Sequence, residues 1–354
     1  MEGDGLRLEV PSWRGDVSAE ADVIEEVARH HGLDKVPTSL PSTATFGGLK
    51  SGQKTERRIR EVLVGAGLTE VVSLALVSEA EAQPSPGPRL PLENPLADVQ
   101  GVLRTSLVIP GLLSCVRSNL RHGRRALRIF ELGRVFRGDL TRPTEETRLA
   151  MLLIGLARPP HWSEAKRPVD FFDVKGLLEL LFRRLGLGGF ELVREGLPSY
   201  LHPGKSALLS WKGQPLGYAG VLHPDLAATW ELREEAVVGE LNLEPILGTA
   251  ATPVKYEALP RFPAVARDLS VLCGQELDAM TLEDWIRDAA GPLLAGVTVS
   301  DRYDRPPVPE GKVSLTLRLR YQHGERTLTS EEVQGSVEAV VTALRSRGAE
   351  IRGE

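Results

Sequence analysis

The stretch from Asn94 to Phe136 constrains the fold most, because it carries turn, helix and strand signals in close succession. Asn94-Pro95 predicts a turn, since the residue before a proline avoids helical angles. Pro110 is expected to open a helix that has apolar residues at helical spacing and that Gly123 ends. Leu127–Phe136 then alternates apolar with polar or charged residues, as a half-buried strand does. The chain must therefore combine helices and strands at short range.

The same stretch is rich in arginine. Between residues 104 and 137 there are eight arginines and a single acid, Glu131. The eight are Arg104, Arg117, Arg121, Arg124, Arg125, Arg128, Arg134 and Arg137. Such a density of forked guanidinium groups suits phosphates, carboxylates or an acidic partner surface. The alternative interpretation is a solvated helix face followed by an edge strand, and the sequence leaves both open.

Length, charge and cysteine content exclude several classes of protein. A chain of 354 residues is expected to hold two or three domains. Its formal net charge of −5 excludes a bulk polycation, so contact with nucleic acid would need local patches. Cys115 and Cys273 form no metal-binding spacing and are interpreted as reduced core residues. No apolar targeting segment or membrane-spanning run occurs, which predicts a soluble cytoplasmic protein that does not contact a membrane.

Three segments are expected. Residues 1–41 should contain a strand at Leu6–Val10, a helix from about Ala19 to His31 that Gly32 ends, and a linker at Pro37–Pro41. Residues 42–251 should form the largest unit. Strands with interspersed helices and a hairpin predict an α+β fold with an antiparallel sheet there.

The expected elements of the largest unit can be placed on the sequence. They are a helix around Lys54–Ala66, a strand at Thr69–Leu76, a proline-rich loop at residues 84–88, the helix and strand of the Asn94–Phe136 stretch, a buried strand at Leu149–Leu156, a helix at Asp170–Leu185, a hairpin of Lys205–Trp211 and Pro215–Leu222, and a strand at Ala236–Leu243.

Residues 252–354 predict a small separate domain with the βαββαβ order of a ferredoxin-like fold. Its expected elements are strand Val265–Leu272, helix Leu282–Ala290, strands Val297–Tyr303 and Lys312–Tyr321, helix Ser330–Arg347 and a short strand Glu350–Arg352.

Four acidic residues near the first helix form the sharpest local constellation. Asp22, Glu25 and Glu26 share one helix face, and Asp16 can fold back toward them. The other face, with Val23, Ile24 and Val27, is expected to pack inward. Clustered carboxylate oxygens suit magnesium or calcium. The alternative is that acids near a helix N-terminus simply favour the helix dipole.

Patterns for catalysis are missing. The sequence contains no GxxxxGK[ST], no GxGxxG after a strand, no HExxH and no GxSxG, and its seven histidines are scattered. No catalytic residue is therefore assigned.

The small domain presents candidate RNA-binding arginines. Along Lys312–Tyr321 the alternation of apolar and polar residues places Arg318 and Arg320 on the sheet face that a ferredoxin-like fold leaves open. Such a face can hold single-stranded RNA. Arg261 and Arg267 flank the first strand and are weaker candidates, because Arg267 could instead pair with the neighbouring Asp268 or cap the domain junction. The alternative is a polar face that only contacts water.

Several stretches resemble one known family. They are PSWRGDVSAEADVIEEVARHHGLDKVP at 11–37, NPLADVQGVLRTSLVIPGLLSCVRSNLRHG at 94–123, LRIFELGRVF at 127–136, DFFDVKGLLELL at 170–181, YLHPGKSALLSWKGQPLGYAGVLHP at 200–224, LPRFPAVARDLSV at 259–271 and ERTLTSEEVQGSVEAVVTALRSRGAEIR at 325–352. In collinear order they resemble the C-terminal part of the bacterial phenylalanine–tRNA ligase beta-subunit family, without the tRNA-binding and editing domains that precede this region.

The resemblance implies a set of sites and partners. The Asp-x5-Asp-x2-Glu-Glu pattern of a magnesium site shared with the catalytic alpha subunit is matched by Asp16, Asp22, Glu25 and Glu26. Residues 1–41 would be the end of a B5-type domain, residues 42–251 a class II synthetase-like domain without an active site, and residues 252–354 an anticodon-binding domain. The implied partners are the alpha subunit, in an alpha2beta2 heterotetramer, and tRNA(Phe). ATP would be a substrate of the assembled enzyme only.

Two departures from the catalytic pattern support that expectation. The order Arg128-Ile129-Phe130-Glu131 differs from the Phe-Arg-x-Glu of an active second class II motif, and the glycine-rich third motif is missing. The resemblance also implies that this chain does not edit mischarged tyrosine.

Two other functions compete. A hydrolytic metal centre at the acidic cluster lacks a nearby nucleophile or histidine base. A stand-alone RNA-binding or assembly protein built on the small domain lacks the aromatic-glycine signature of an RRM in Lys312–Tyr321.

Overall fold

The computed structural model describes residues 5–40, 42, 47–83, 85, 87–95, 97–139, 141–249, 256 and 258–352. The chain divides into two compact units, Met1–Pro253 and Val254–Glu354, and each is described here by itself. In the described part of the chain, no helix is long and apolar enough to cross a membrane.

Within residues 5–40, the structure shows the α-helix α1 (Glu20–His31), followed by a 3-10 turn, η1 (Leu33–Lys35). Gly32 ends α1 with a φ of 103°, as predicted. The predicted strand at Leu6–Val10 is wrong, because no described strand pairs with these residues. The predicted inward packing is also wrong: Ile24 and Val27 are 61% and 63% exposed, and none of the residues of α1 is buried.

The larger unit is built on a seven-stranded sheet of order β1-β5-β6-β10-β9-β8-β7. Its strands are β1 (Thr69–Glu70), β5 (Leu127–Asp139), β6 (Arg142–Ile154), β7 (Glu191–Val193), β8 (Leu201–Trp211), β9 (Gln214–Leu222) and β10 (Ala236–Asn242). Every pairing is antiparallel except that of β1 with β5. The predicted α+β class with an antiparallel sheet is confirmed.

Both faces of the central strands are buried. Along β6, Leu149, Met151 and Leu153 belong to one core, and the alternate residues Ala150, Leu152 and Ile154 belong to the other. Because neither face meets water, this strand is apolar without alternation, as strands buried on both faces are.

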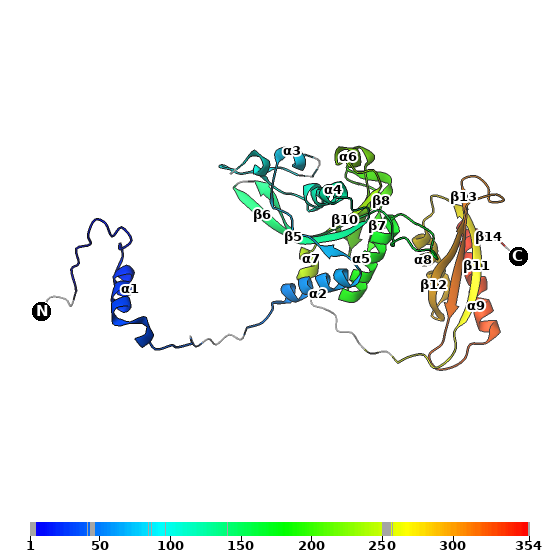
Figure 1. Ribbon diagram of the computed structural model, residues 1–354. Helices are drawn as coiled ribbons and strands as arrows, with labels where there is room; N and C mark the ends of the chain where they lie inside the picture. Colours follow the sequence, from blue (N-terminus) through cyan, green and yellow to red (C-terminus); the bar gives the residue numbers. More distant parts are fainter. Residues whose placement is uncertain are drawn as a thin grey trace. The chain divides into compact units, whose positions relative to one another are not determined.

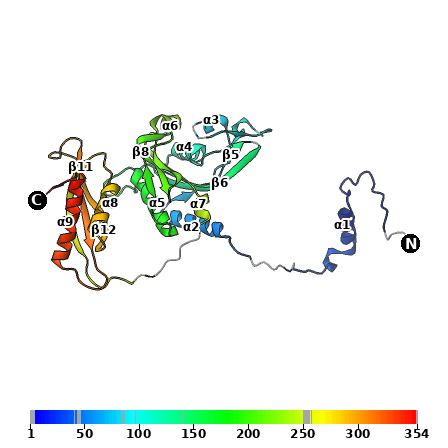
Figure 2. The ribbon, with the colours of Figure 1, turned by 180° about the vertical axis from the view of Figure 1, so that it is seen from behind.

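Helices supply the other side of each core (Figures 1 and 2). The first core is completed by α2 (Ser51–Gly65), α5 (Phe171–Leu185) and the short α7 (Glu244–Leu247). The second is completed by the helical turn η3 (Val108–Leu112), α4 (Leu113–Arg121) and α6 (Pro224–Thr229).

Most predicted elements of this unit are present, with one correction. The hairpin of β8 and β9 turns at Lys212 and Gly213, whose φ angles are 52° and 74°. The predicted strand Thr69–Leu76 is wrong over its middle, since only β1 and β2 (Leu76–Val77) are extended in a sheet and Val72 and Leu74 are exposed. The helix begins at Pro110 as predicted, because Ile109 before it has the non-helical angles φ −115° and ψ 116°, so that η3 is kinked there. The Ile109–Pro110 peptide bond is cis.

A small subsidiary sheet is formed by residues between β1 and α4. It contains β2, β3 (Leu90–Pro91) and β4 (Val102–Leu103), with α3 (Glu79–Ala82) and the 3-10 turn η2 (Asp98–Gln100) between them. Residues 84 and 86 of the predicted proline-rich loop lie outside the described residues.

The second unit has the predicted ferredoxin-like order. Its elements are β11 (Val265–Gly274), α8 (Ala279–Ala290), β12 (Leu294–Tyr303), β13 (Lys312–Tyr321), α9 (Ser330–Ser346) and β14 (Glu350–Arg352). The sheet order is β12-β13-β11-β14, and the two helices bury one sheet face in a single core.

A buried ion pair fastens the segment at Arg104 to strand β5. Arg104 and Glu131 are 2.7 Å apart, with side chains only 5% and 2% exposed. Glu131 also accepts a hydrogen bond from the Ser73 hydroxyl at 2.6 Å, and Arg104 Nε donates to the Arg134 carbonyl oxygen at 2.8 Å. The interpretation of the arginine run as a solvated helix face followed by an edge strand is therefore wrong at Arg104, and β5 has strands on both sides.

Breaking this pair should destabilise the larger unit strongly. Arg104→Met leaves the Glu131 carboxylate buried without its counter-ion, which costs about 3–5 kcal/mol. The double variant Arg104→Met/Glu131→Leu removes both charges and should lose much less than the single variant. Urea denaturation followed by tryptophan fluorescence measures both losses. A double variant at least as unstable as Arg104→Met would contradict this role.

Candidate functional site

The acidic cluster is organised by an arginine that the sequence-based interpretation did not use. Arg14 Nε donates to Asp16 Oδ1 at 2.9 Å, and Arg14 Nη2 bonds both Asp16 and Glu26. Arg29 pairs with Glu26 from the next turn of α1. The structure therefore brings Asp16 and Glu26 together, but around a guanidinium group.

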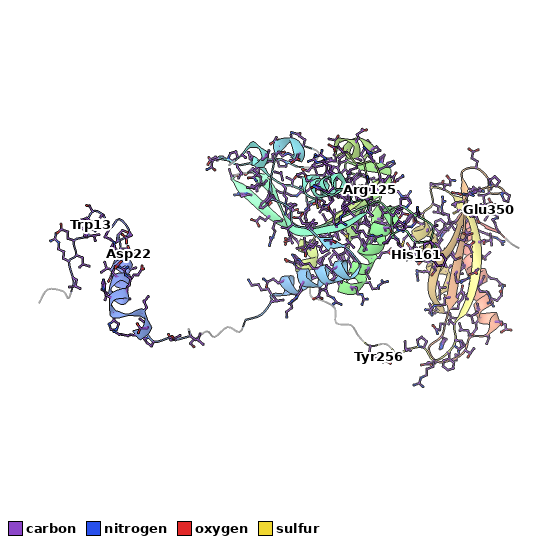
Figure 3. The ribbon with its side chains drawn as sticks, in the orientation of Figure 1. Trp13, Asp22, Arg125, His161, Tyr256 and Glu350 are labelled. Atoms are coloured by element: carbon purple, nitrogen blue, oxygen red, sulfur yellow. The ribbon has the colours of Figure 1, made fainter. Side chains whose placement is uncertain are left out.

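The other two acids take different places. Asp22 caps α1, because its carboxylate accepts hydrogen bonds from the backbone N–H groups of Ser18 and Ala19, each at 2.8 Å. Figure 3 labels this residue on α1. Glu25 is exposed and has no hydrogen bond or ion pair with any residue that the structure describes.

These contacts keep the carboxylates ionised. The hydrogen bond from Arg14 lowers the pKa of Asp16 to about 2. Arg14 and Arg29 lower the pKa of Glu26, and the two backbone N–H groups lower that of Asp22. At neutral pH the three groups are thus anions whose charge is met by arginine and by the helix N-terminus.

As arranged, the four residues do not fit a magnesium ion. In the described ranges no three His, Cys, Asp or Glu side chains are grouped so that they could hold a metal. Arg14 stands between Asp16 and Glu26, where a cation would be needed, and Asp22 is used as a cap.

Removing the arginine should expose any affinity for magnesium. In Arg14→Ala, Asp16 and Glu26 lose their counter-ion, and their mutual repulsion favours a divalent ion. We expect magnesium to bind at least about tenfold more tightly than to the parent chain, as measured by titration calorimetry with magnesium chloride. Adding Glu25→Gln and Glu26→Gln should abolish the gain. If the parent, Arg14→Ala and the variant with all three substitutions bind magnesium equally well, the cluster is not a magnesium site, and the acids only interact favourably with the helix dipole.

The predicted exposure of Arg318 and Arg320 is confirmed. Both lie on the face of β13 away from the helices. The alternate residues Leu317 and Leu319 point to the other face and are buried. Arg318 is held by Asp268 on β11, with Nε–Oδ1 and Nη2–Oδ2 distances of 2.8 Å and 2.7 Å. This guanidinium lowers the pKa of Asp268. Arg320 donates to Gln322 Oε1 at 3.1 Å.

The weaker candidates lie elsewhere. Arg267 is opposite Leu319 in the sheet register, which places it on the helix side of the pleat, and it donates to the Ala266 carbonyl oxygen at 3.0 Å. Its suggested pairing with Asp268 is wrong, because Asp268 pairs with Arg318. Arg261 is exposed in the segment before β11. Only the register of the two strands could have revealed the Asp268 contact.

Two domain-level matches define the class of protein. The model described as "tRNA synthetase B5 domain" matches residues 1–33, and the "Ferredoxin-fold anticodon binding domain" matches residues 260–352. Together they indicate a component of an aminoacyl-tRNA synthetase.

The family follows from the largest match. The model described as "Phenylalanyl tRNA synthetase beta chain CLM domain" matches residues 36–243, which is more than half of the chain. The chain belongs to this phenylalanyl-tRNA synthetase beta-chain family, as the sequence resemblance predicted.

Curated relatives match nearly the whole length of the chain. The phenylalanine–tRNA ligase beta subunit of Symbiobacterium thermophilum is 39% identical over 358 residues, covering 98% of this chain and 40% of the relative. Those of Bacillus subtilis and Listeria monocytogenes serotype 4b are 38% and 35% identical, with 43% and 44% of the relatives covered. The chain thus spans less than half the length of these relatives.

Among solved structures, a pyrrolysyl-tRNA synthetase from Desulfitobacterium hafniense is 20% identical with a TM-score of 0.43. The match covers 55% of this chain and 64% of the pyrrolysyl-tRNA synthetase chain.

Proposed function

We propose that the chain is a non-catalytic part of phenylalanine–tRNA ligase, supporting the ATP-dependent attachment of phenylalanine to tRNA(Phe). It would do so by assembling with the catalytic alpha subunit and by binding tRNA. The observation that carries this proposal is the family membership of residues 36–243 together with the anticodon-binding match at residues 260–352.

The contacts of the second class II motif support a non-catalytic role. Arg128 donates to the Ala157 carbonyl oxygen, and Glu131 is enclosed by Arg104 and Ser73. These contacts hold the side chains of Arg128 and Glu131 against other parts of the protein, so neither is free to bind a substrate. ATP is therefore proposed as a substrate of the assembled enzyme, whose catalytic residues the alpha subunit supplies.

Magnesium and the acidic cluster belong to this proposal as well. The ion would be held by Asp16, Asp22, Glu25 and Glu26, but only after Arg14 has moved away from Asp16 and Glu26. We propose that the docked alpha subunit binds the Arg14 guanidinium group in their place. A cytoplasmic location and an alpha2beta2 stoichiometry complete the proposal.

Co-purification tests the assembly. A tagged copy of the chain, expressed in its source cell, should retain the alpha subunit in a fixed stoichiometric ratio, because only a synthetase subunit requires that partner. An unrelated tagged protein of similar charge serves as the control. Recovery of the chain alone, or with RNA but without the alpha subunit, would contradict the subunit role and favour a stand-alone RNA-binding protein.

The open face of the small domain should contact tRNA through arginine. Arg318→Ala/Arg320→Ala should weaken tRNA(Phe) binding and flatten its salt dependence by roughly one unit per lost phosphate contact. Asp268→Asn should do the reverse, because it frees Arg318 from its carboxylate partner. Both variants should keep the fold, since Arg318, Arg320 and Asp268 are exposed.

Filter binding with labelled tRNA across a series of salt concentrations measures these effects. Arg267→Ala, on the other side of the pleat, is the matched control and should leave the salt slope unchanged. If the double variant binds as the parent does at every salt concentration, this face is not the RNA site.

A further inference from the structure

One end of the seven-stranded sheet carries a basic and aromatic surface that the proposed function does not use. We call it the basic end and define it as the turn at residues 122–126 and the loop at residues 157–167. The two segments lie side by side. Arg128 donates to the Ala157 carbonyl oxygen, and a Cβ at Gly155 would collide with the Arg125 carbonyl oxygen.

Cations outnumber acids around this surface. Its two segments contain five cations, Arg124, Arg125, Arg158, Lys166 and Arg167, against one acid, Glu164. Arg158 pairs with Glu164 at 2.8 Å, and Arg167 pairs with Asp173 at 2.7 Å. The side chains of Arg124, Arg125 and Lys166 have no partner among the residues described. In a chain of net charge −5, this is a local positive excess.

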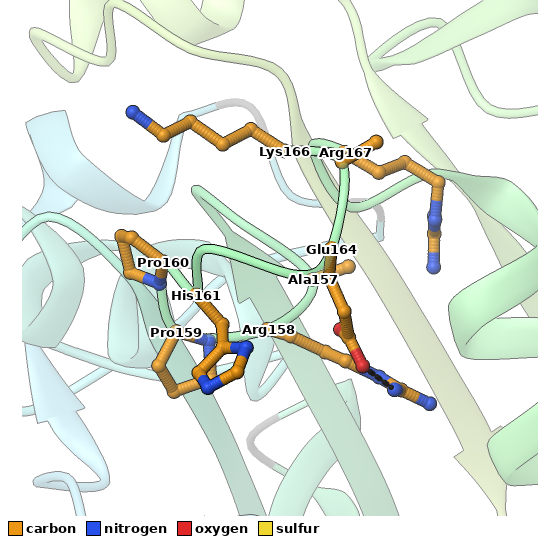
Figure 4. Close-up of a pocket in the computed structure, with 9 residues that line it drawn as sticks. Ala157, Arg158, Pro159, Pro160, His161, Glu164, Lys166 and Arg167 are labelled. Carbon is orange, nitrogen blue, oxygen red and sulfur yellow. Dashed lines mark hydrogen bonds and ion pairs between the residues drawn. The ribbon is translucent and has the colours of Figure 1, made fainter.

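Aromatic rings accompany the charge. Trp162 is 91% exposed, and its ring centroid lies 5.5 Å from that of His161. The loop lines an open pocket of about 410 Å³. Figure 4 shows the guanidinium groups of Arg158 and Arg167 on one side of this loop and Lys166 extending the other way.

We propose that the basic end binds unpaired RNA, with phosphates on Arg124 and Arg125 and an unstacked base on Trp162. Single-stranded nucleic acid combines a charged backbone with planar bases, and the sites that bind it pair cations with exposed aromatic faces. An acidic peptide would use the cations but would leave the exposed ring without a role. This inference concerns a surface separate from Arg318 and Arg320, and it stands whether or not the chain serves a ligase.

Binding of the full chain to a fluorescein-labelled 20-nucleotide oligouridylate tests it. Fluorescence anisotropy across a potassium chloride series should show a salt slope about 1.4 units lower for Arg124→Ala/Arg125→Ala, from two lost contacts to a single strand. Trp162→Ala should weaken binding at least about fivefold at every salt concentration, as loss of one stacked base does.

The chain offers matched controls for both variants. Arg183→Ala/Arg184→Ala also removes two consecutive arginines and therefore the same charge. These residues lie in the last turn of α5, roughly 20 Å along the helix from its N-cap residue Asp170. Trp13→Ala removes another exposed tryptophan. Both controls should bind as the parent does. Because all of these side chains are exposed, unchanged thermal melting verifies that the variants are folded.

The outcomes separate this surface from the small domain. The losses caused by the Arg124 and Trp162 variants should persist when Arg318→Ala/Arg320→Ala is also present. Equal losses in the Arg183 control would show a general charge effect and overturn the proposal. It is also overturned if a labelled polyglutamate binds and depends on Arg124 and Arg125, while oligouridylate does not bind.

Discussion

The burial of the central strands on both faces is the constraint on which the larger unit depends. Any charged group within such a sheet must find its partners inside the protein. Glu240, on β10, accepts hydrogen bonds from the Ser106 hydroxyl at 2.6 Å and from the Tyr218 hydroxyl at 2.9 Å, and it pairs with Arg148. Burial raises the pKa of Tyr218 well above its usual value, so its phenol remains a neutral donor. With the Arg104–Glu131 pair, these contacts hold the segment that begins at Arg104 against the sheet.

The same chemistry explains how the chain uses arginine. Inside the sheet domain, arginines neutralise buried or half-buried acids and shape the fold. At the surface, acids restrain arginines: Asp268 holds Arg318, and Asp16 with Glu26 surrounds Arg14. A partner at either surface must therefore compete with an existing ion pair. Since exposed ion pairs contribute little to stability, exchanging one for a contact with a partner costs little free energy.

Much of this architecture could be predicted, because periodicity reports burial directly. The alternation in Lys312–Tyr321 and the unbroken apolar run at Leu149–Leu156 correspond to a strand with one open face and a strand with none. The errors lie where partners are distant. Leu6–Val10 alternates apolar and charged residues, but no strand in the described part of the chain pairs with it, and Ile24 and Val27 have no described element over them. Asp268 and Arg318 are fifty residues apart and meet only through strand register, which a single sequence does not reveal.

The central claim is that this chain contributes structure and binding surfaces but no catalytic residues. Phenylalanine-dependent exchange of pyrophosphate into ATP tests it most directly, because the reaction needs a complete ATP and amino-acid site and no tRNA. We predict no exchange by the pure chain and exchange once the alpha subunit from the same cell is added. Exchange by the chain alone, at a rate that follows its concentration and survives repeated purification, would contradict the account.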